Sequence, residues 1–210
     1  MRSIILDLDG TLVDSVPLHV TTWHDAFVDA GRPVPTRAIH AAIGMGSTRL
    51  IHHLLGEVPD DDLHEQLEEG HRSRFVEAGE VLQPTPGALG LLEDLTARDV
   101  PFVVATSAGS AEREILLGVL GDPDVHVTGG DSTDDSKPAP DPLQAALGGL
   151  GTTASPLVTM VGDSPWDGHA AATLGLRFAA VRSGGFDDAV LREAHADLLV
   201  DHPSGLIGVL

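Results

Sequence analysis

Apolar residues of the chain fall into short continuous runs that alternate, over most of its length, with segments of helical spacing. These runs are typical of strands buried on both faces, and they lie at residues 4–8, 102–105, 125–127, 157–161, 178–181 and 198–200. Helix start signals, such as Ser110 and the pair Asp141 and Pro142, stand between the later runs. The alternation predicts an α/β fold with a doubly wound parallel sheet and right-handed crossovers.

Residues 15–84 interrupt this alternation, because they carry helical patterns only. Ser15 is expected to cap a first helix that holds Pro17 in its first turn. Further helices are expected at residues 36–43, 50–55 and 63–75. We therefore expect an α/β core domain made of residues 1–14 and 85–210, with an all-helical domain of residues 15–84 inserted into it.

Acidic and hydroxyl side chains stand where the expected strands end. Asp7 and Asp9 are two residues apart at the end of the first run, so both carboxylates lean to the same side. Thr106 and Ser107 close the second run, and Asp163 follows the run at 157–161. Because open α/β sheets bind ligands beyond the carboxyl ends of their strands, we expect these side chains to share one site.

The composition excludes several classes of function. A net charge of −20 and an aromatic content of 3% argue against nucleic-acid or anionic-membrane partners. The chain has no cysteine, so disulfides and thiolate chemistry are excluded. No apolar stretch reaches the roughly 18 residues of a membrane span. We expect a cytoplasmic protein that is a monomer or a homodimer.

Lysine occurs once, at Lys137, although the chain has 12 basic residues. A compact ammonium suits a point-charge role that a planar guanidinium fills poorly. Chance within an arginine-rich composition is the alternative explanation.

Four stretches in order resemble the motifs of the haloacid dehalogenase-like (HAD) superfamily. They are Asp7-Leu8-Asp9-Gly10-Thr11-Leu12-Val13-Asp14-Ser15, Thr106 at its strand end, Lys137-Pro138-Ala139-Pro140-Asp141, and Gly162-Asp163-Ser164-Pro165-Trp166-Asp167. The resemblance implies a Rossmann-like HAD core and a magnesium-dependent phosphatase that works through an aspartyl-phosphate. Its partner would be a small phosphorylated metabolite. The helical block resembles the C1-type cap of that superfamily.

The resemblance and the chemistry together suggest a role for each residue. Asp7 would be the nucleophile, and Asp9 would act first as general acid and then as general base. Mg²⁺ prefers oxygen ligands, and here they would be the carboxylates of Asp7 and Asp163 with the backbone carbonyl of Asp9. The phosphoryl oxygens would be held by Gly10, Thr106, Ser107 and Lys137, with Lys137 also offsetting transition-state charge.

Three interpretations remain open at this point. Asp167 fits equally a place behind the metal ligands and the N3 position of a capping box that begins at Ser164. The cap residues Gly46, Ser47 and Arg49 are candidates for contacting the leaving group, although Arg49 could equally be a surface arginine. A third set, His64, Glu68 and His71, shares one helix face, which we interpret as solvated rather than metal-binding.

Within the superfamily, Asp9 favours phosphate chemistry, because the dehalogenases lack this second acid. A phosphatase resembling phosphoglycolate phosphatase fits best, and a phosphomutase of the β-phosphoglucomutase type is the alternative. Such mutases usually carry an arginine three residues after the glycine of the cap loop, and here Ser47 stands at that place after Gly44. A receiver-like signalling domain is disfavoured, because the acid pair heads the chain and about 70 helical residues follow it.

Overall fold

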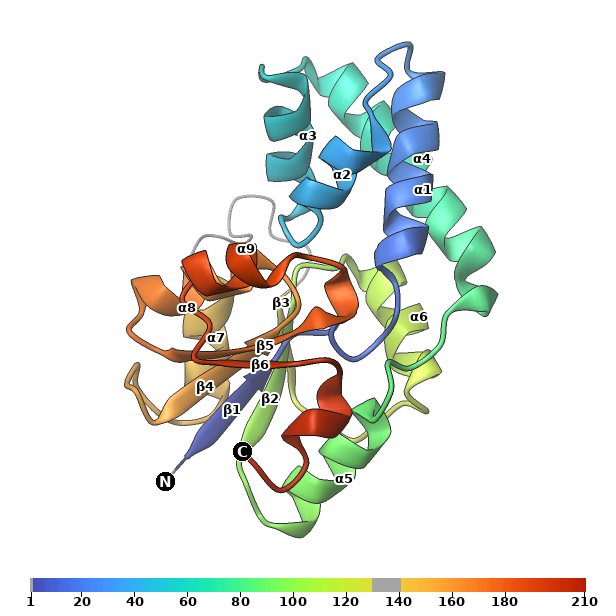
Figure 1. Ribbon diagram of the computed structural model, residues 1–210. Helices are drawn as coiled ribbons and strands as arrows, with labels where there is room; N and C mark the ends of the chain where they lie inside the picture. Colours follow the sequence, from blue (N-terminus) through green and yellow to red (C-terminus); the bar gives the residue numbers. More distant parts are fainter. Residues whose placement is uncertain (1, 130–140) are drawn as a thin grey trace.

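The structure is a computed structural model that describes residues 2–129 and 141–210. Its parallel sheet runs in the order β3-β2-β1-β4-β5-β6 (Figure 1). The strands are β1 (Ser3–Leu6), β2 (Phe102–Thr106), β3 (Val127–Gly129), β4 (Val158–Gly162), β5 (Arg177–Val181) and β6 (Leu198–Val200). The predicted doubly wound α/β fold is confirmed.

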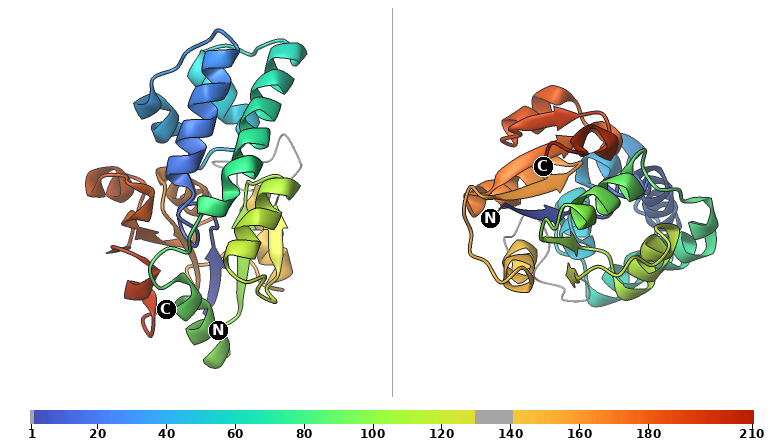
Figure 2. Two further views of the ribbon diagram at one scale, coloured as in Figure 1. Left: turned by 90° about the vertical axis from the view of Figure 1, so that its right-hand side faces the viewer. Right: turned by 90° about the horizontal axis from the view of Figure 1, so that it is seen from below.

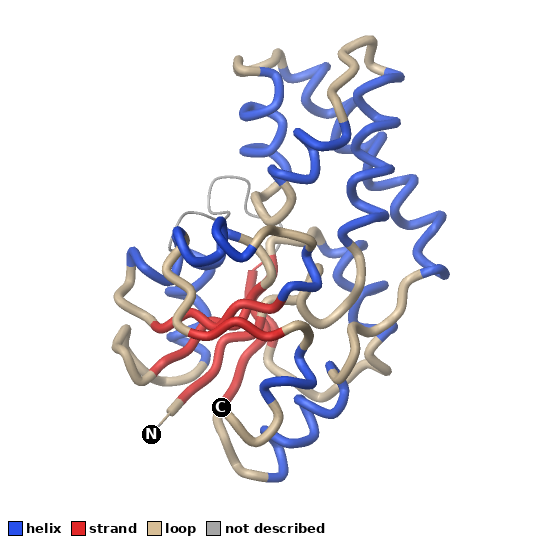
Figure 3. The backbone as a smooth tube through the Cα atoms, viewed as in Figure 1, coloured by secondary structure: helices blue, strands red, loops and turns tan. Residues whose placement is uncertain are grey.

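Strand β1 lies at the centre of the sheet because its apolar side chains serve both faces. Ile4 and Leu6 pack into one hydrophobic cluster, together with residues of α5 (Ala88–Ala97) and α6 (Ser110–Val119). Ile5 points the other way, into a second cluster with residues of α7 (Asp141–Gly149), α8 (Pro165–Thr173) and α9 (Asp188–Glu193). Helices therefore cover both faces of the sheet, as Figure 3 shows.

A block of helices stands over the carboxyl ends of the strands (Figures 1 and 2). It consists of α1 (Val16–Asp29), α2 (Thr36–Ala42), α3 (Ser47–Leu55), α4 (Asp61–Ala78) and the 3-10 helix Gly79–Val81. The block has its own hydrophobic cluster, in which Trp23 and Phe27 of α1 pack with Leu67 of α4. Its treatment as a separate domain stays a prediction.

The chain enters and leaves the helical block at adjacent points. Val13 and Pro84 form an isolated antiparallel bridge. The Asp14 amide donates to the Gln83 carbonyl, and the Thr85 amide donates to the Leu12 carbonyl, both at 2.9 Å. The two connecting segments are thus hydrogen-bonded to each other.

The start of α1 agrees with expectation, whereas that of α6 differs. Ser15 is the N-cap residue of α1, although its side chain makes no capping hydrogen bond to the helix. Helix α6 begins at Ser110 itself, so its N-cap residue is Gly109. No helix in the described part of the chain combines the length and the apolar character needed to cross a membrane.

Candidate active site

Three buried aspartates meet at the carboxyl end of the sheet. Asp7 directly follows β1, Asp163 directly follows β4, and Asp167 lies in the first turn of α8. One carboxylate oxygen from each lies within 4.8 Å of the others. Like charges this close repel strongly in a buried place, so the arrangement calls for a cation.

Hydrogen bonding links two of these acids through a residue that the sequence analysis missed. The Thr11 hydroxyl lies 3.1 Å from Oδ2 of Asp7 and 3.1 Å from Oδ1 of Asp163. A hydroxyl has one hydrogen, so the two carboxylates share a single donor. The position four residues after Asp7, in the turn of the first motif, was the available signal.

Glycines surround the acids because no larger residue fits there. Gly10 has a φ of +69°, and a Cβ on it would lie 2.2 Å from Oδ2 of Asp163. A Cβ on Gly184, in the 3-10 helix that follows β5, would lie 2.0 Å from the same oxygen. Backbone thus packs directly against Asp163 from two elements and fixes the place of its carboxylate.

The donor set fits a hard divalent cation. The group consists of carboxylate oxygens only, which Mg²⁺ prefers over nitrogen or sulfur ligands. The described residues therefore agree with a divalent metal at Asp7 and Asp163.

The two oxygens of Asp9 have different surroundings. Its Oδ1 accepts a hydrogen bond from the Ser15 hydroxyl at 2.8 Å and faces Nε2 of His19 at 2.8 Å. Ser15 in turn accepts from the Gly10 amide at 3.2 Å, so its own hydrogen is available for Asp9. The Ser15 hydroxyl therefore orients Asp9 instead of capping α1. The other oxygen, Oδ2, lies 3.3 Å from Oγ1 of Thr106.

The hydroxyls at the end of β2 lie beside Asp9. Oγ1 of Thr106 accepts the Ala108 amide at 3.0 Å, while its hydrogen points to Asp9. Oγ of Ser107 is buried and has no hydrogen-bond partner among the described residues. The Ser107 hydroxyl, next to Thr106, is thus available to bond an oxygen of a ligand. The last predicted member, Lys137, lies outside the described residues.

Asp167 takes part in two arrangements at once. Its Oδ2 accepts from the Ser164 amide at 3.2 Å and from the Ser164 hydroxyl at 2.6 Å, which forms the predicted capping box of α8. It also belongs to the group of three acids. The two roles weighed from the sequence are therefore compatible in geometry.

The loop before α3 meets the core at the start of α8. A Cβ on Gly44 would lie 2.6 Å from Oγ of Ser164 and 3.0 Å from Cδ1 of Trp166. The Trp166 indole donates to the Ala41 carbonyl at 3.3 Å. Ser47 donates to Glu68 of α4, so its hydroxyl is engaged inside the helical block. Substrate contacts of Gly46, Ser47 and Arg49 stay predictions.

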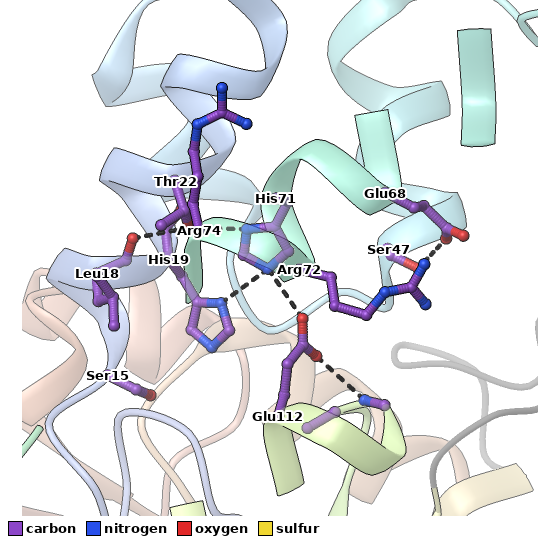
Figure 4. Close-up of polar contacts among 12 residues, drawn as sticks. Ser15, Leu18, His19, Thr22, Ser47, Glu68, His71, Arg72, Arg74 and Glu112 are labelled. Carbon is purple, nitrogen blue, oxygen red and sulfur yellow. Dashed lines mark hydrogen bonds and ion pairs between the residues drawn. The ribbon is translucent and has the colours of Figure 1, made fainter. Parts of the chain in front are cut away.

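A second histidine, His71, and a glutamate, Glu112, lie beside His19 (Figure 4). Nδ1 of His19 (α1) lies 3.3 Å from Nε2 of His71 (α4), and that same Nε2 lies 3.2 Å from Oε1 of Glu112 (α6). The solvated interpretation of His71 was wrong: only 4% of it is exposed. Its face of α4 packs on α1 and α6, and sequence spacing within one helix does not reveal such distant neighbours.

The charges of this cluster alternate. Burial lowers the pKa of His19, but the nearby Asp9 carboxylate outweighs it and leaves that pKa raised. Burial lowers the pKa of His71, and the charge of His19 adds to this effect. Burial would raise the pKa of Glu112, yet its hydrogen bond to His71 and the charge of that ring lower it to about 2. The pKa of His19 is thus raised and that of His71 lowered, although the two rings lie in contact between two carboxylates.

Known proteins resemble this chain in sequence and in fold. The profile of the haloacid dehalogenase-like hydrolases matches residues 1–175. A phosphoglycolate phosphatase of Rhodospirillum rubrum is 33% identical over 200 residues, covering 87% of this chain and 80% of that protein. The crystal structure of a hydrolase from Pseudomonas syringae is 30% identical with a TM-score of 0.94, covering 99% of this chain and 97% of that one.

A putative β-phosphoglucomutase from Bacteroides vulgatus has a TM-score of 0.87 at 21% identity, covering 99% of this chain and 86% of that one. At this identity the likeness shows the fold alone. The family profile, the phosphoglycolate phosphatase and the Pseudomonas syringae hydrolase all indicate the same family, and each match spans most of the chain. The chain therefore belongs to the haloacid dehalogenase-like hydrolases and is an enzyme of their phosphatase type.

Proposed function

We propose that this enzyme hydrolyses small phosphate monoesters through an aspartyl-phosphate on Asp7, and that phosphoglycolate is the first substrate to test. One observation carries the proposal: Asp7, Asp163 and Asp167 offer oxygens within 4.8 Å of one another, and Asp9 follows Asp7 by two residues. The relatives named phosphoglycolate phosphatase, at about 30% identity, support the choice of substrate.

The nucleophile of the proposal is Asp7. It directly follows β1, and its Oδ2 accepts from the Thr11 hydroxyl. A carboxylate attacking a phosphoryl group forms an acyl-phosphate, and water then cleaves it, so one difficult displacement becomes two easier ones. Charge must be offset on both reactants, because an anion approaches three anionic oxygens.

Magnesium is the cofactor that this donor set suggests. The carboxylates of Asp7 and Asp163 would hold it, together with the backbone carbonyl of Asp9, and Asp167 would support them from α8. When bound, the cation neutralises the negative charge of the phosphoryl oxygens. Gly10 and Gly184 keep Asp163 in place for this purpose.

Asp9 is the general acid and base of the proposal. Its Oδ1 is occupied by Ser15 and His19, so the transferable proton belongs on Oδ2. That oxygen faces Thr106, which lies next to Ser107 at the expected phosphoryl position. Asp9 would protonate the leaving alcohol there and then accept a proton from the attacking water.

The remaining roles concern the phosphoryl group and access to it. Thr106, Ser107 and the turn at Gly10 would hold phosphoryl oxygens, and Lys137 would offset transition-state charge. Residues 15–84 would form a cap that excludes water and selects the substrate. A cytoplasmic location and a monomeric or homodimeric state complete the proposal.

The test is phosphate release with Mg²⁺ from a panel of small esters that includes phosphoglycolate. We expect Asp7→Asn to lower the rate by about 1,000-fold or more, because an amide is a very poor nucleophile. Asp14→Asn is the matched control: it makes the same change in an exposed acid of the same segment. Its rate should stay within about twofold of wild type.

The outcomes separate the candidate functions. Release by wild type that is lost on chelation and in Asp7→Asn supports the proposal, and the preferred ester names the substrate class. An unchanged rate in Asp7→Asn contradicts the role of Asp7. Absence of release from every ester contradicts the phosphatase and directs the next assay to hexose phosphates and the phosphomutase alternative.

A further inference from the structure

We propose that Glu112 and His71 are positioning residues that hold His19 against Asp9, so that the general acid is aligned only while the helical block is seated on the core. The inference rests on the proposed function, because it concerns the acid of the same reaction. None of the three residues belongs to the motifs that point to the site.

The contacts form one continuous chain between two carboxylates. Glu112 Oε1 lies 3.2 Å from Nε2 of His71, which lies 3.3 Å from Nδ1 of His19. Nε2 of His19 then lies 2.8 Å from Oδ1 of Asp9. A carboxylate only accepts hydrogen bonds, so the Nε2–H of His19 is the donor to Asp9.

Glu112, at the end of this series of contacts away from Asp9, is fixed by the core. Glu112 lies on α6, directly after the strand that carries Thr106, and its Oε2 accepts the Gly109 amide at 3.1 Å. Both of its oxygens are therefore engaged, one by the backbone and one by His71. Glu112 thus presents its charge to the helical block from a fixed point.

The two rings have little freedom to turn. The Thr22 hydroxyl donates to the Leu18 carbonyl at 2.9 Å, so its oxygen accepts the Nδ1–H of His71 at 2.8 Å. Trp23 stacks on His71 with centroids 4.1 Å apart and planes 8° apart. Phe75 stacks on His19 with centroids 4.3 Å apart. These contacts set the ring planes and therefore the direction of the His19 donor.

The series of side-chain contacts from Glu112 to Asp9 crosses the boundary between block and core twice. His19 and His71 come from α1 and α4, and Figure 4 shows them beside Glu112 of the core helix α6. Asp9, after β1, also belongs to the core. Lifting the block would remove both rings together and leave Asp9 and Glu112 without their histidine contacts, with only the Thr106 hydroxyl and the Gly109 amide as core donors. Seating the block restores the donor to Asp9 and leaves Oδ2 as the oxygen that carries the proton. The geometry therefore ties general-acid alignment to the position of the block.

The decisive experiment compares two substrates in Glu112→Gln. p-Nitrophenyl phosphate has a leaving group that departs without a proton, whereas phosphoglycolate releases an alkoxide that needs one. The parameter kcat/KM covers only the steps up to departure of that group. We expect it to fall by about 10- to 100-fold for phosphoglycolate and by less than about threefold for the aryl ester.

Control variants make the comparison specific. Glu114→Gln removes the same charge from an exposed position of the same helix and should leave both values unchanged. His71→Gln interrupts the chain at its middle and should reproduce the selective loss, which also covers the case that Glu112→Gln does not fold. Equal losses for both esters, or no loss, would overturn the inference.

A measurement without substrate separates this inference from the proposed function. Ring ¹⁵N NMR shifts of His19 should change in Glu112→Gln, although Glu112 reaches His19 only through His71. Unchanged His19 shifts overturn the positioning role. If wild type hydrolyses no ester but the His19 shifts respond, the proposed function fails while the physical coupling stands.

Discussion

At the scale of single residues, the site depends on the donors that contact its acids. Thr11 gives one hydroxyl hydrogen to two buried carboxylates, each 3.1 Å away. Asp9 receives two donors on Oδ1 and only the longer contact from Thr106, at 3.3 Å, on Oδ2. Removing one of these donors takes a hydrogen bond from a buried or half-buried carboxylate, which is costly.

Thr11→Val tests this dependence by replacing the hydroxyl with a methyl group of similar size. We expect the free energy of unfolding of the metal-free protein to fall by about 1–3 kcal/mol. Excess Mg²⁺ should reduce the loss, because a cation offsets the same charges. Urea unfolding with Mg²⁺ and with chelator measures both values.

The control for Thr11→Val is Thr21→Val, an exposed threonine whose hydroxyl donates to the Pro17 carbonyl within α1. It should show no dependence on Mg²⁺. An equal loss for Thr11→Val with and without Mg²⁺ would mean that the hydroxyl supports folding but not the acids.

Sequence reasoning predicted those candidate residues whose position follows from strand order. Asp7, Thr106 and Asp163 stand at or directly after a strand end, and parallel strands bring such ends to one edge. It missed Thr11 and His19, and for Ser15 it predicted the N-cap position but not the contact with Asp9. Their partners are set by turns and by helix packing, which apolar periodicity does not encode.

At the scale of elements, three helices share one buried contact between a histidine and a carboxylate. His71 of α4 contacts Glu112 of α6 and is packed on α1 through Thr22 and Trp23. The sequence predicted these helices but not the pair, because Glu112 lies in a different part of the chain from His71. The residues three and four positions from His71 within α4 do not indicate its contact with Glu112.

Glu112 should make the stability of the protein depend on acid pH. Its pKa is lowered from 4.5 to about 2 in the folded protein, mainly by His71 against the opposing effect of burial. A lowered pKa gives a stabilisation that is complete above pH 4.5 and is lost as the pH falls toward 2. Near neutral pH, we expect the free energy of unfolding of wild type to exceed that of Glu112→Gln by on the order of 1–3 kcal/mol.

Urea unfolding at several pH values would measure this difference. It should shrink as the pH is lowered below 4.5, because the carboxyl then takes up a proton in the unfolded chain before it does so in the folded protein. Glu114→Gln, in an exposed position of the same helix, should show no such trend. A difference that stays constant down to about pH 3 would contradict a lowered pKa of Glu112.

At the scale of the whole molecule, the net charge of −20 opposes both folding and an anionic substrate. The proposed site works with dianionic esters, so its own donors must overcome this field locally. Salt acts on the long-range repulsion far more than on buried contacts.

Ionic strength should therefore raise both stability and activity. Between about 0.01 M and 0.15 M salt the screening length falls from about 30 Å to about 8 Å. We expect the midpoint of urea unfolding and kcat/KM for phosphoglycolate to increase over this range. Sucrose at equal osmolality is the control, and a fall of kcat/KM with salt would show that local positive potential dominates at long range.

The paired segments at Val13 and Pro84 constrain how the helical block can be related to the core. Both of its tethers leave from one place and are hydrogen-bonded to each other. Such a joint permits rotation of the block about one axis and resists its translation along the core. Because both connections lie at one place, the sheet does not depend on the length of the segment between them. Helical blocks of other lengths could therefore be inserted there without changes to the sheet.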